Sequence, residues 1–350
     1  MRHAVAVVAL VLSPLLANAS ETLSVHNWND YIDPIVLADF QRETGITVEY
    51  NTYSTREEIE QRLNSDTRID VAMPPHDLLA SLIQGKRLRP LNPAQLDNRQ
   101  HLDRELLAKL APLDPGNRHA LPYLWTSAGL AINVPQAESA YGGPLPPSWS
   151  VLFDPSSSQR LATCGISLLD APYELYSGLL NYQGQRFSRT TQRRLARATD
   201  TLLTLRPNVR YIDSERYIDD LNAGHLCVAL AWSGDALAAA AAGQPVQFVI
   251  PEEGTALSID SMVIPVTAAN PDAAHRFINY LMRPEVAARI SNATFYASAN
   301  KAAGEHLAPE LRRNPAMFPD AQTKRRLALL ESLPAKLEPT LTQHWNQVRQ

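Results

Sequence analysis

In the first hundred residues, short continuous apolar stretches alternate with segments in which apolar residues recur every three to four positions. Three apolar stretches have the length and composition of buried strands, and each is followed by a segment with apolar residues at helical spacing. Asp33 and Pro34 predict the start of the first helix, and Ser54 with Glu57 has the spacing of a capping box at the start of the second. The predicted strands cover residues 23–28, 46–53 and 68–75, and the predicted helices begin at residues 34, 54 and 78.

The same alternation returns in the second half of the chain. A strand and turn at 164–172 precede a helix at 174–184, and the stretch 226–243 reads as a strand that leads into a helix. Two further strands lie within 247–266, and Pro271 and Pro284 each predict a helix start. Strand–helix alternation is typical of an α/β fold with a largely parallel sheet between helices. Because 350 residues exceed one usual core, we expect two lobes.

The chain begins like an exported protein. Arg2 precedes an apolar run at residues 4–16 and a small-residue end, so residues 1–19 are predicted to be a cleaved signal peptide. No Cys follows the predicted cleavage point, and no other apolar stretch is long enough for a membrane span, so we expect a released protein in the periplasm. The whole chain carries a net charge of −4, which disfavours nucleic acid and is compatible with a cationic ligand.

Only two cysteines are present, Cys164 and Cys227. In an oxidising compartment an even pair is expected to form one disulfide, and the alternative is two buried, unpaired thiols. The nine histidines show no metal-ligand spacing, and we expect neither a metal nor a cofactor.

Aromatic and acidic residues recur where the predicted strands end. Ligands of open α/β sheets bind at these carboxyl ends. Carboxylates would accept charge-assisted hydrogen bonds from ammonium groups, and aromatic faces would cover the methylenes between them. Taken singly, such an acid is more often a helix cap and such a Trp more often core; their recurrence favours a binding site. The residues at these ends are Trp28, Asn29, Asp30, Tyr31, Pro75, His76, Asp77, Asp170, Glu174, Trp232, Ser233, Asp235, Ser258 and Asp260.

Several longer motifs carry a family resemblance over essentially the whole mature chain. They are NWNDYI, LDAP followed by Glu174, CVALAWSGD and FYASANKAA, with LRPNVRY and YLMRPEVA in support. With these motifs the chain resembles the periplasmic binding proteins of polyamine ABC transporters, the putrescine- and spermidine-binding family. The resemblance implies an α/β, two-lobed periplasmic-binding-protein fold of type II, in which each lobe is a mixed sheet flanked by helices and the two are joined by a hinge. It also implies a disulfide between the two cysteines.

The resemblance implies a function and a lobe division. A small cationic amine would be held between the lobes and delivered to an inner-membrane ABC permease by a monomer. Lobe 1 would comprise 20–124 and 244–292, and lobe 2 would comprise 125–243 and 293–350, with the first crossing within YLWTSAG. The residues that match the family's ligand set are Trp28, Asp30, Tyr31, Glu174, Trp232, Asp235, Asp260 and Tyr296, and Asn29 within the first motif is also expected to bind ligand.

Two residues depart from the family pattern. Ser258 stands where such proteins usually have an aromatic side chain, and Asp77 stands where they have a small or hydroxyl side chain. One hypothesis is a pocket that is wider and more acidic at one end, which would favour agmatine or spermidine over putrescine. The alternative is that Asp77 points to solvent and Ser258 only loosens a diamine site.

Three other functions were weighed against amine transport. A sensor that presents its closed form to a membrane receptor would have the same fold. A secreted hydrolase could use Asp170, Glu174 and Asp235 as paired acids, with His76 as a base, but no hydrolase motif is present, so we expect a protein that is not an enzyme. An α-amino acid ligand would need a base in the pocket, and none stands at the strand ends unless Arg210 reaches in. The pattern does not rank putrescine, cadaverine, agmatine, spermidine and spermine.

Overall fold

The computed structural model describes residues 21–350, so the predicted signal peptide lies outside the described residues. The strands are β1 (Thr22–Trp28), β2 (Thr47–Tyr53), β3 (Val71–Ala72), β4 (Ala120–Asn133), β5 (Ile166–Leu168), β6 (Tyr211–Ile212), β7 (Val228–Trp232), β8 (Val246–Val249), β9 (Thr255–Val263), β10 (Ala297–Ser298) and β11 (Leu327–Leu329). The longer helices are α1 (Pro34–Thr44), α2 (Arg56–Asn64), α5 (Val134–Tyr141), α8 (Pro172–Tyr182), α9 (Gln192–Leu205), α11 (Ser233–Ala241), α12 (Pro271–Leu281), α13 (Pro284–Thr294) and α16 (Glu338–Val348). The shorter ones are α3 (Leu79–Gln84), α4 (Arg104–Leu110), α6 (Ser150–Phe153), α7 (Pro155–Leu161), α10 (Arg216–Asn222), α14 (Pro309–Arg312) and α15 (Ala321–Lys324).

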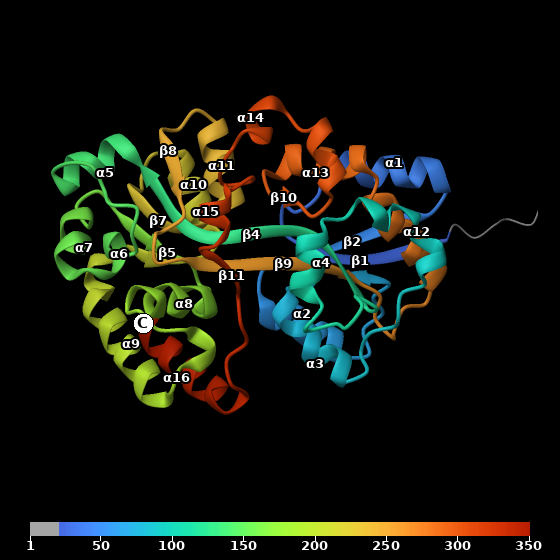
Figure 1. Cartoon of the computed structure of the whole chain (residues 1–350), viewed down its shortest axis with the longest axis horizontal. Helices are drawn as coiled ribbons and strands as arrows, with labels where there is room; N and C mark the ends of the chain where they lie inside the picture. The colour runs from blue at the N-terminus through green and yellow to red at the C-terminus, as the bar shows by residue number, and fades with distance from the viewer. Residues whose placement is uncertain (1–20) are drawn as a thin grey trace, which may run out of the picture.

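The strands pair in the order β2-β1-β3-β9-β4-β7-β5-β6, with β10 and β8 on β4 and β11 on β9. Strands β1, β2 and β3 are parallel to one another, and so are β5, β6 and β7. Strands β4 and β9 run antiparallel to each other between these two groups. Helices cover the sheet in both halves of the molecule, so the fold has the mixed α/β character that was predicted (Figure 1).

Two separate hydrophobic cores define two lobes. The first core contains Leu23, Phe40 and Phe277, and the second contains Trp149, Tyr176 and Leu230. Strand β4 contributes Leu124 to the first core and Leu130 to the second, so it crosses between the lobes within the predicted YLWTSAG segment. Strand β9 runs beside β4 through the middle of the molecule (Figure 1).

The lobe boundaries along the rest of the chain stay a prediction. Val246 of β8 packs in the second core, because β8 pairs with the second half of β4. Ala299 packs in the first core, next to β10, which pairs with Trp125 and Leu124 of β4. The cores therefore favour a boundary after residue 249 rather than at 244, and one beyond 299 rather than at 293.

The helix starts follow local chemistry, with one difference from the prediction. Asp33 caps α1 by accepting a hydrogen bond from the backbone N of Ile35. At α2 the cap is Thr55, whose hydroxyl accepts from the backbone N of Glu58, so the predicted Ser54–Glu57 capping box is wrong by one residue. Both pairs have the required spacing, and the Ser54 hydroxyl is instead held by the Asn29 side chain at 2.7 Å.

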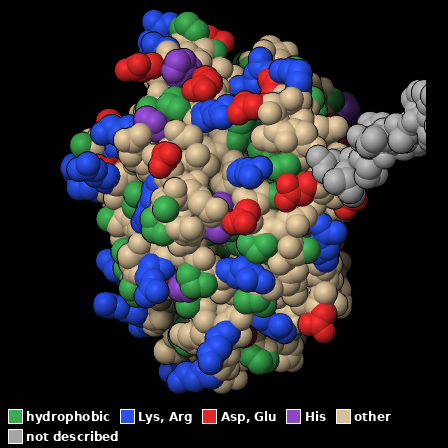
Figure 2. Space-filling model, turned by 90° about the vertical axis from the view of Figure 1, so that its right-hand side faces the viewer, with side chains coloured by type: hydrophobic (Ala, Val, Ile, Leu, Met, Phe, Trp, Pro, Cys, Tyr) green, Lys and Arg blue, Asp and Glu red, His purple; other side chains and the backbone are tan. Residues whose placement is uncertain are grey.

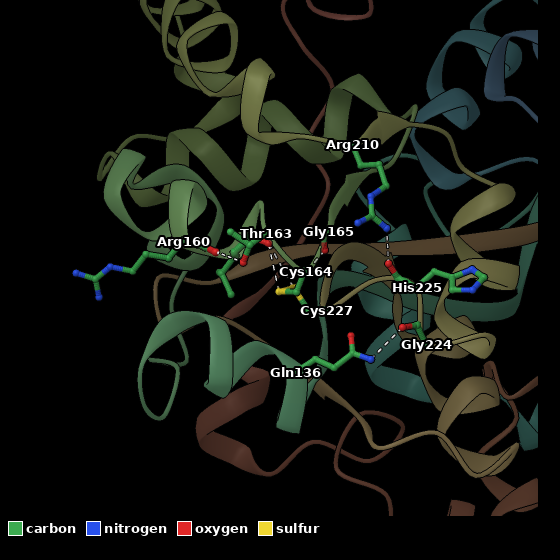
Figure 3. Close-up of a disulfide and its surroundings, with 10 residues drawn as sticks. Gln136, Arg160, Thr163, Cys164, Gly165, Arg210, Gly224, His225 and Cys227 are labelled. Atoms are coloured by element: carbon green, nitrogen blue, oxygen red, sulfur yellow. Dashed lines mark hydrogen bonds between the residues drawn. A yellow bond between two sulfur atoms is a disulfide. The ribbon is translucent and has the colours of Figure 1, made fainter.

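The predicted disulfide is confirmed. Cys164 and Cys227 are bonded, with their Cα atoms 5.5 Å apart, just before β5 and β7 (Figure 3). The backbone N of Cys227 also donates to the carbonyl of Gly165 at 3.1 Å, so the bridge supports two neighbouring parallel strands. The Arg210 guanidinium donates to the carbonyl of His225 beside the bridge (Figure 3). It also lies against Gly165, where β5 and β7 begin, so Arg210 does not reach the carboxyl ends of these strands.

The end of the first lobe carries charges of both signs. Basic and acidic side chains are interspersed over this face, and hydrophobic side chains lie singly or in small groups (Figure 2). This pattern is ordinary for a face that meets solvent, because an interaction surface is more often a contiguous apolar patch. Several polar and aromatic residues that the sequence singled out lie instead between the lobes.

Candidate functional site

Asp260 is the centre of the wall that the first lobe contributes. Trp28 Nε1 donates to Asp260 Oδ1 at 3.0 Å, and the Tyr31 hydroxyl donates to Oδ2 at 2.7 Å. The three residues meet because β1 ends at Trp28 and β3, the strand between β1 and β9, brings Asp260 alongside. Ser258 lies two residues earlier on β9, so its side chain shares the face of Asp260 and is buried. The NWNDYI motif therefore contributes Trp28 and Tyr31 to this wall.

Asp235 is the centre of the opposite wall. It lies in the first turn of α11, directly after β7, and accepts hydrogen bonds from the hydroxyls of Tyr217 and Tyr296, the latter at 2.8 Å. Trp232 ends β7 and donates its backbone N to the Tyr217 hydroxyl at 3.3 Å. The Tyr296 ring meets the Tyr31 ring edge to face at 4.7 Å. Because Tyr296 packs in the first core together with Tyr31, its hydrogen bond to Asp235 is the contact that joins the two walls.

Asn29 and Asp30 lie at the rim. Both are exposed, and the Asn29 amide donates to Ser54 and, at 3.0 Å, to Glu215 of the second lobe. Asp30 has φ 52°, a left-handed conformation that Asp tolerates better than most residues. Its negative charge contributes to the raised pKa of Asp235, which places it within electrostatic range of the site.

Three carboxyl groups of the site are difficult to ionise. Burial raises the pKa of Asp235 to about 6, that of Asp260 to about 7 and that of Glu174 to about 8. The hydrogen bonds from tyrosine and tryptophan donors oppose this effect at the two aspartates but do not cancel it. Within residues 21–350, no Lys, Arg or His forms an ion pair with any of the three. A cationic ligand would supply the missing charge partner.

The surroundings of the Asp77 side chain disagree with both hypotheses drawn from the sequence. Its side chain is only 5% exposed and accepts a hydrogen bond from Arg56 Nε at 2.5 Å, so the expectation that it points to solvent is wrong. It is also not a spare acid for a ligand, because the Arg56 guanidinium already neutralises it. Arg56 was not predicted, since it stands in the first turn of a helix and not at a strand end.

Two tyrosines were also missed. Tyr217 holds Asp235 from α10, and nothing in the local pattern of that helix indicates a site residue. The Arg56 guanidinium lies over the Tyr173 ring, with 5.0 Å between Cζ and the ring centroid. The signal for Tyr173 was present, because it directly precedes Glu174 in the same aromatic and acidic pattern that marked the other strand ends.

His76 is a structural residue. It is fully buried, its Nδ1 accepts from the backbone N of Ile259 at 3.2 Å, and its Nε2 donates to the carbonyl of Leu330 at 2.8 Å. Burial lowers the pKa of the imidazole, so the ring is neutral. Both ring nitrogens are engaged with the backbone, which leaves neither free to act as a base or to gate a ligand.

Asp170 does not belong to the site. Its carboxylate accepts from Trp345 Nε1 at 2.8 Å and pairs with Arg349 at 2.9 Å, so it anchors the C-terminal helix α16. The set of paired acids that a hydrolase would have needed is therefore incomplete.

The fold and the site define a class of protein. Two lobes share crossing strands and enclose buried acids and aromatic rings, as expected of a solute-binding protein that holds its ligand between lobes. The described part of the chain holds no helix with the length and apolarity for crossing a bilayer. Residues 36–319 match the model of the bacterial extracellular solute-binding protein family, and the chain belongs to this family.

Individual relatives agree with this assignment and with the resemblance found in the sequence. The chain is 38% identical over 343 residues to the putrescine-binding periplasmic protein PotF of Escherichia coli (strain K12), covering 95% of this chain and 93% of the relative. It is 35% identical to a putrescine/agmatine-binding protein of Pseudomonas aeruginosa, with coverage of 95% and 92%. The structure of the spermidine/putrescine ABC transporter substrate-binding protein PotD from Streptococcus pneumoniae superimposes with a TM-score of 0.80 at 27% identity, covering 95% of this chain and 100% of that one.

Proposed function

We propose that this protein captures a polyamine between its lobes in the periplasm and delivers it to an inner-membrane ABC permease. The observation that carries the proposal is the pair of buried acids, Asp235 and Asp260, which lie on opposite walls with raised pKa values and have no cationic partner among residues 21–350. Relatives that match over nearly the whole chain bind putrescine, agmatine or spermidine.

The site offers partners for both the ammonium groups and the methylene groups of a polyamine. Each carboxylate would accept charge-assisted hydrogen bonds from one ammonium group, while the Trp28 and Trp232 rings would cover the methylenes. A cation over such a ring gains roughly 0.5 to 2 kcal/mol. The phenol groups of Tyr31 and Tyr296 already hold the carboxylates in place, so little side-chain ordering is left for the binding step.

Ligand binding and lobe closure are coupled in this proposal. An amine that reaches Asp260 on one wall and Asp235 on the other contacts both lobes at once. Closure is then stabilised by the contacts that the ligand makes only in the closed form. The hinge would lie in β4 and β9, whose residues belong to both cores.

Calorimetric titration of residues 20–350 tests the proposal. Putrescine, cadaverine, agmatine, spermidine and spermine are the ligands, with glutamate and a neutral sugar as negative controls. We expect at least one amine to bind, and we expect the Asp260→Asn, Trp232→Ala double variant to lose that binding. The matched control is Glu310→Gln, Phe318→Ala, which removes an exposed acid and an exposed ring that make no contact with the site. Folded wild-type protein that binds none of the amines would overturn the proposal.

Identifying the membrane protein that binds the amine-loaded form tests delivery to a permease. The amine-loaded protein, proposed to act as a monomer, should co-purify with an ABC permease from solubilised membranes. Recovery of a receptor in place of a permease would assign the protein to sensing and not to transport.

A further inference from the structure

Arg56 joins the two lobes at one end of the site. It stands at the start of α2 in the first lobe, where its Nε donates to Asp77 at 2.5 Å and its Nη1 to Glu60 at 2.9 Å. Its guanidinium also lies over the ring of Tyr173, at the start of α8 in the second lobe, with 5.0 Å between Cζ and the ring centroid. One side chain therefore contacts an acid of one lobe and an aromatic face of the other.

The partners of Arg56 are themselves fixed. The Asp77 side chain is almost fully buried, and the Arg56 side chain is only 24% exposed. The Tyr173 hydroxyl donates to Glu338, and its ring packs edge to face on Phe187 at 5.8 Å. Because it is held on both sides, the guanidinium has one defined position between the lobes.

That position is the end of the site that contains Glu174 and Asp260. Tyr173 directly precedes Glu174 in α8, and Asp77 follows Pro75, which forms a β-bridge with Asp260. In the proposed binding mode, the distal amine of a polyamine longer than a diamine would extend toward this end and meet the guanidinium. It already makes the two contacts that such an amine would seek, an ion pair with a buried carboxylate and a cation–π contact with an aromatic ring.

We propose that Arg56, anchored by Asp77 and covered by Tyr173, is a specificity-determining residue that limits the length of the ligand. The proposal rests on the proposed amine-binding function and narrows it to short diamines such as putrescine. A third charged nitrogen, as in spermidine, would meet the like charge of Arg56. Making room for it would also require breaking the buried ion pair between Arg56 and Asp77, which is costly in a site that excludes water.

The test compares affinities for putrescine and spermidine by calorimetric titration at pH 8. The variants are Arg56→Gln, Asp77→Ser, which removes both charges together, and Arg56→Gln alone. The matched control is Arg283→Gln, Glu43→Ser, because Arg283 pairs with Glu43 at 2.6 Å and lies over the Tyr280 ring at 4.9 Å, remote from the site. Thermal unfolding of each variant checks that it is folded.

Wild-type protein should bind putrescine at least tenfold more tightly than spermidine. The double variant should move this ratio at least tenfold toward spermidine, the single Arg56 variant should move it in the same direction, and the control should leave it unchanged. Wild-type preference for spermidine, or an unchanged ratio in the folded Arg56 variants, would overturn the length limit while leaving amine binding intact. Wild-type protein that binds no amine would overturn both this inference and the proposed function.

Discussion

At the scale of single residues, the site is built from acids that the folded chain does not neutralise. Asp260 is buried and accepts hydrogen bonds from Trp28 and Tyr31, yet burial still raises its pKa to about 7. Neutral donors stabilise a carboxylate less than a cation does. The chain therefore gives up some stability at this position, which a cationic ligand would restore.

Asp260→Asn should weaken putrescine binding and, in the absence of ligand, make the protein more stable. Loss of a charge-assisted contact of about 1.5–3 kcal/mol should weaken putrescine binding roughly 10- to 100-fold. In the absence of ligand, the variant should unfold at a higher temperature than wild-type protein at pH 8, because it no longer keeps an ionised carboxylate in a buried site. Titration calorimetry and thermal unfolding give the two values.

The control for this prediction is Asp66→Asn, which neutralises an exposed acid of the same lobe. It should change neither the affinity nor the unfolding temperature appreciably. An Asp260→Asn protein that is less stable without ligand at pH 8 would show that the carboxylate supports the fold instead of being a cost to it.

At the scale of elements, the ends of β1 and β7 and the middle of β9 bring the acids together. Contacts at the opposite ends of the strands support this arrangement. In the second lobe the bridge between Cys164 and Cys227 closes a stretch with a sequence separation of 63 residues and ties β5 to β7. The chain-entropy model gives about 4 kcal/mol for a loop of this length. The bridge thus contributes to the stability of the lobe that carries Trp232 and Asp235.

Replacing both cysteines by serine should lower the free energy of unfolding by up to about 4 kcal/mol. Denaturant unfolding of wild-type and variant protein measures the difference, and wild-type protein under reducing conditions is the matched comparison. Amine affinity at low temperature should stay close to that of wild type, since the bridge does not contact the site residues. An unchanged unfolding midpoint would mean that the bridge does not constrain the unfolded chain.

At the scale of the whole molecule, the site couples the two lobes to each other and to pH. Contacts cross between the lobes from Asn29 to Glu215 and from Arg56 to Tyr173, and the acids lie between them. A ligand that bridges the acids must find them ionised, so the protonation state of the site sets how strongly the closed form is favoured.

Ligand stabilisation should therefore increase with pH. Asp235, Asp260 and Glu174 have folded-state pKa values of about 6, 7 and 8, above the values near 4 of unfolded carboxyl groups. Between about pH 4 and 8 the folded state binds more protons than the unfolded state at these groups, so their contribution to stability falls as pH rises. A bound dication reverses that loss by pairing with the ionised form.

The rise in unfolding temperature on adding putrescine should thus be larger at pH 8 than at pH 5.5. Calorimetry at both pH values, with and without ligand, measures it. Proton release on binding at pH 5.5, seen as a dependence of the binding heat on the buffer, would give independent support. A ligand-induced shift that is equal or larger at pH 5.5 would contradict the assignment of these acids to the ligand.

The sequence by itself determined the features that depend on neighbours along the chain. Strand and helix periods, proline and aspartate at helix starts and an even number of cysteines predicted the α/β elements and the disulfide. The recurrence of acids and aromatic rings at predicted strand ends selected Trp28, Tyr31, Asp235 and Asp260. Trp28, Tyr31 and Asp235 do follow or end parallel strands, which brings them together. Asp260 instead lies in the middle of the antiparallel strand β9, so its position at a strand end was predicted wrongly. Family motifs then supplied the two-lobed fold.

Only the tertiary structure decided which acids are left without a partner. Arg56 neutralises Asp77 from 21 residues away, and Tyr217 holds Asp235 from 18 residues away, with no local pattern to indicate either contact. Partner choice between buried charges depends on distance and on exclusion of water, and both arise only when the lobes pack together. The set of acids without an ion pair in the described residues, Asp235, Asp260 and Glu174, and the pairing of Asp77 with Arg56 are thus properties of the folded molecule.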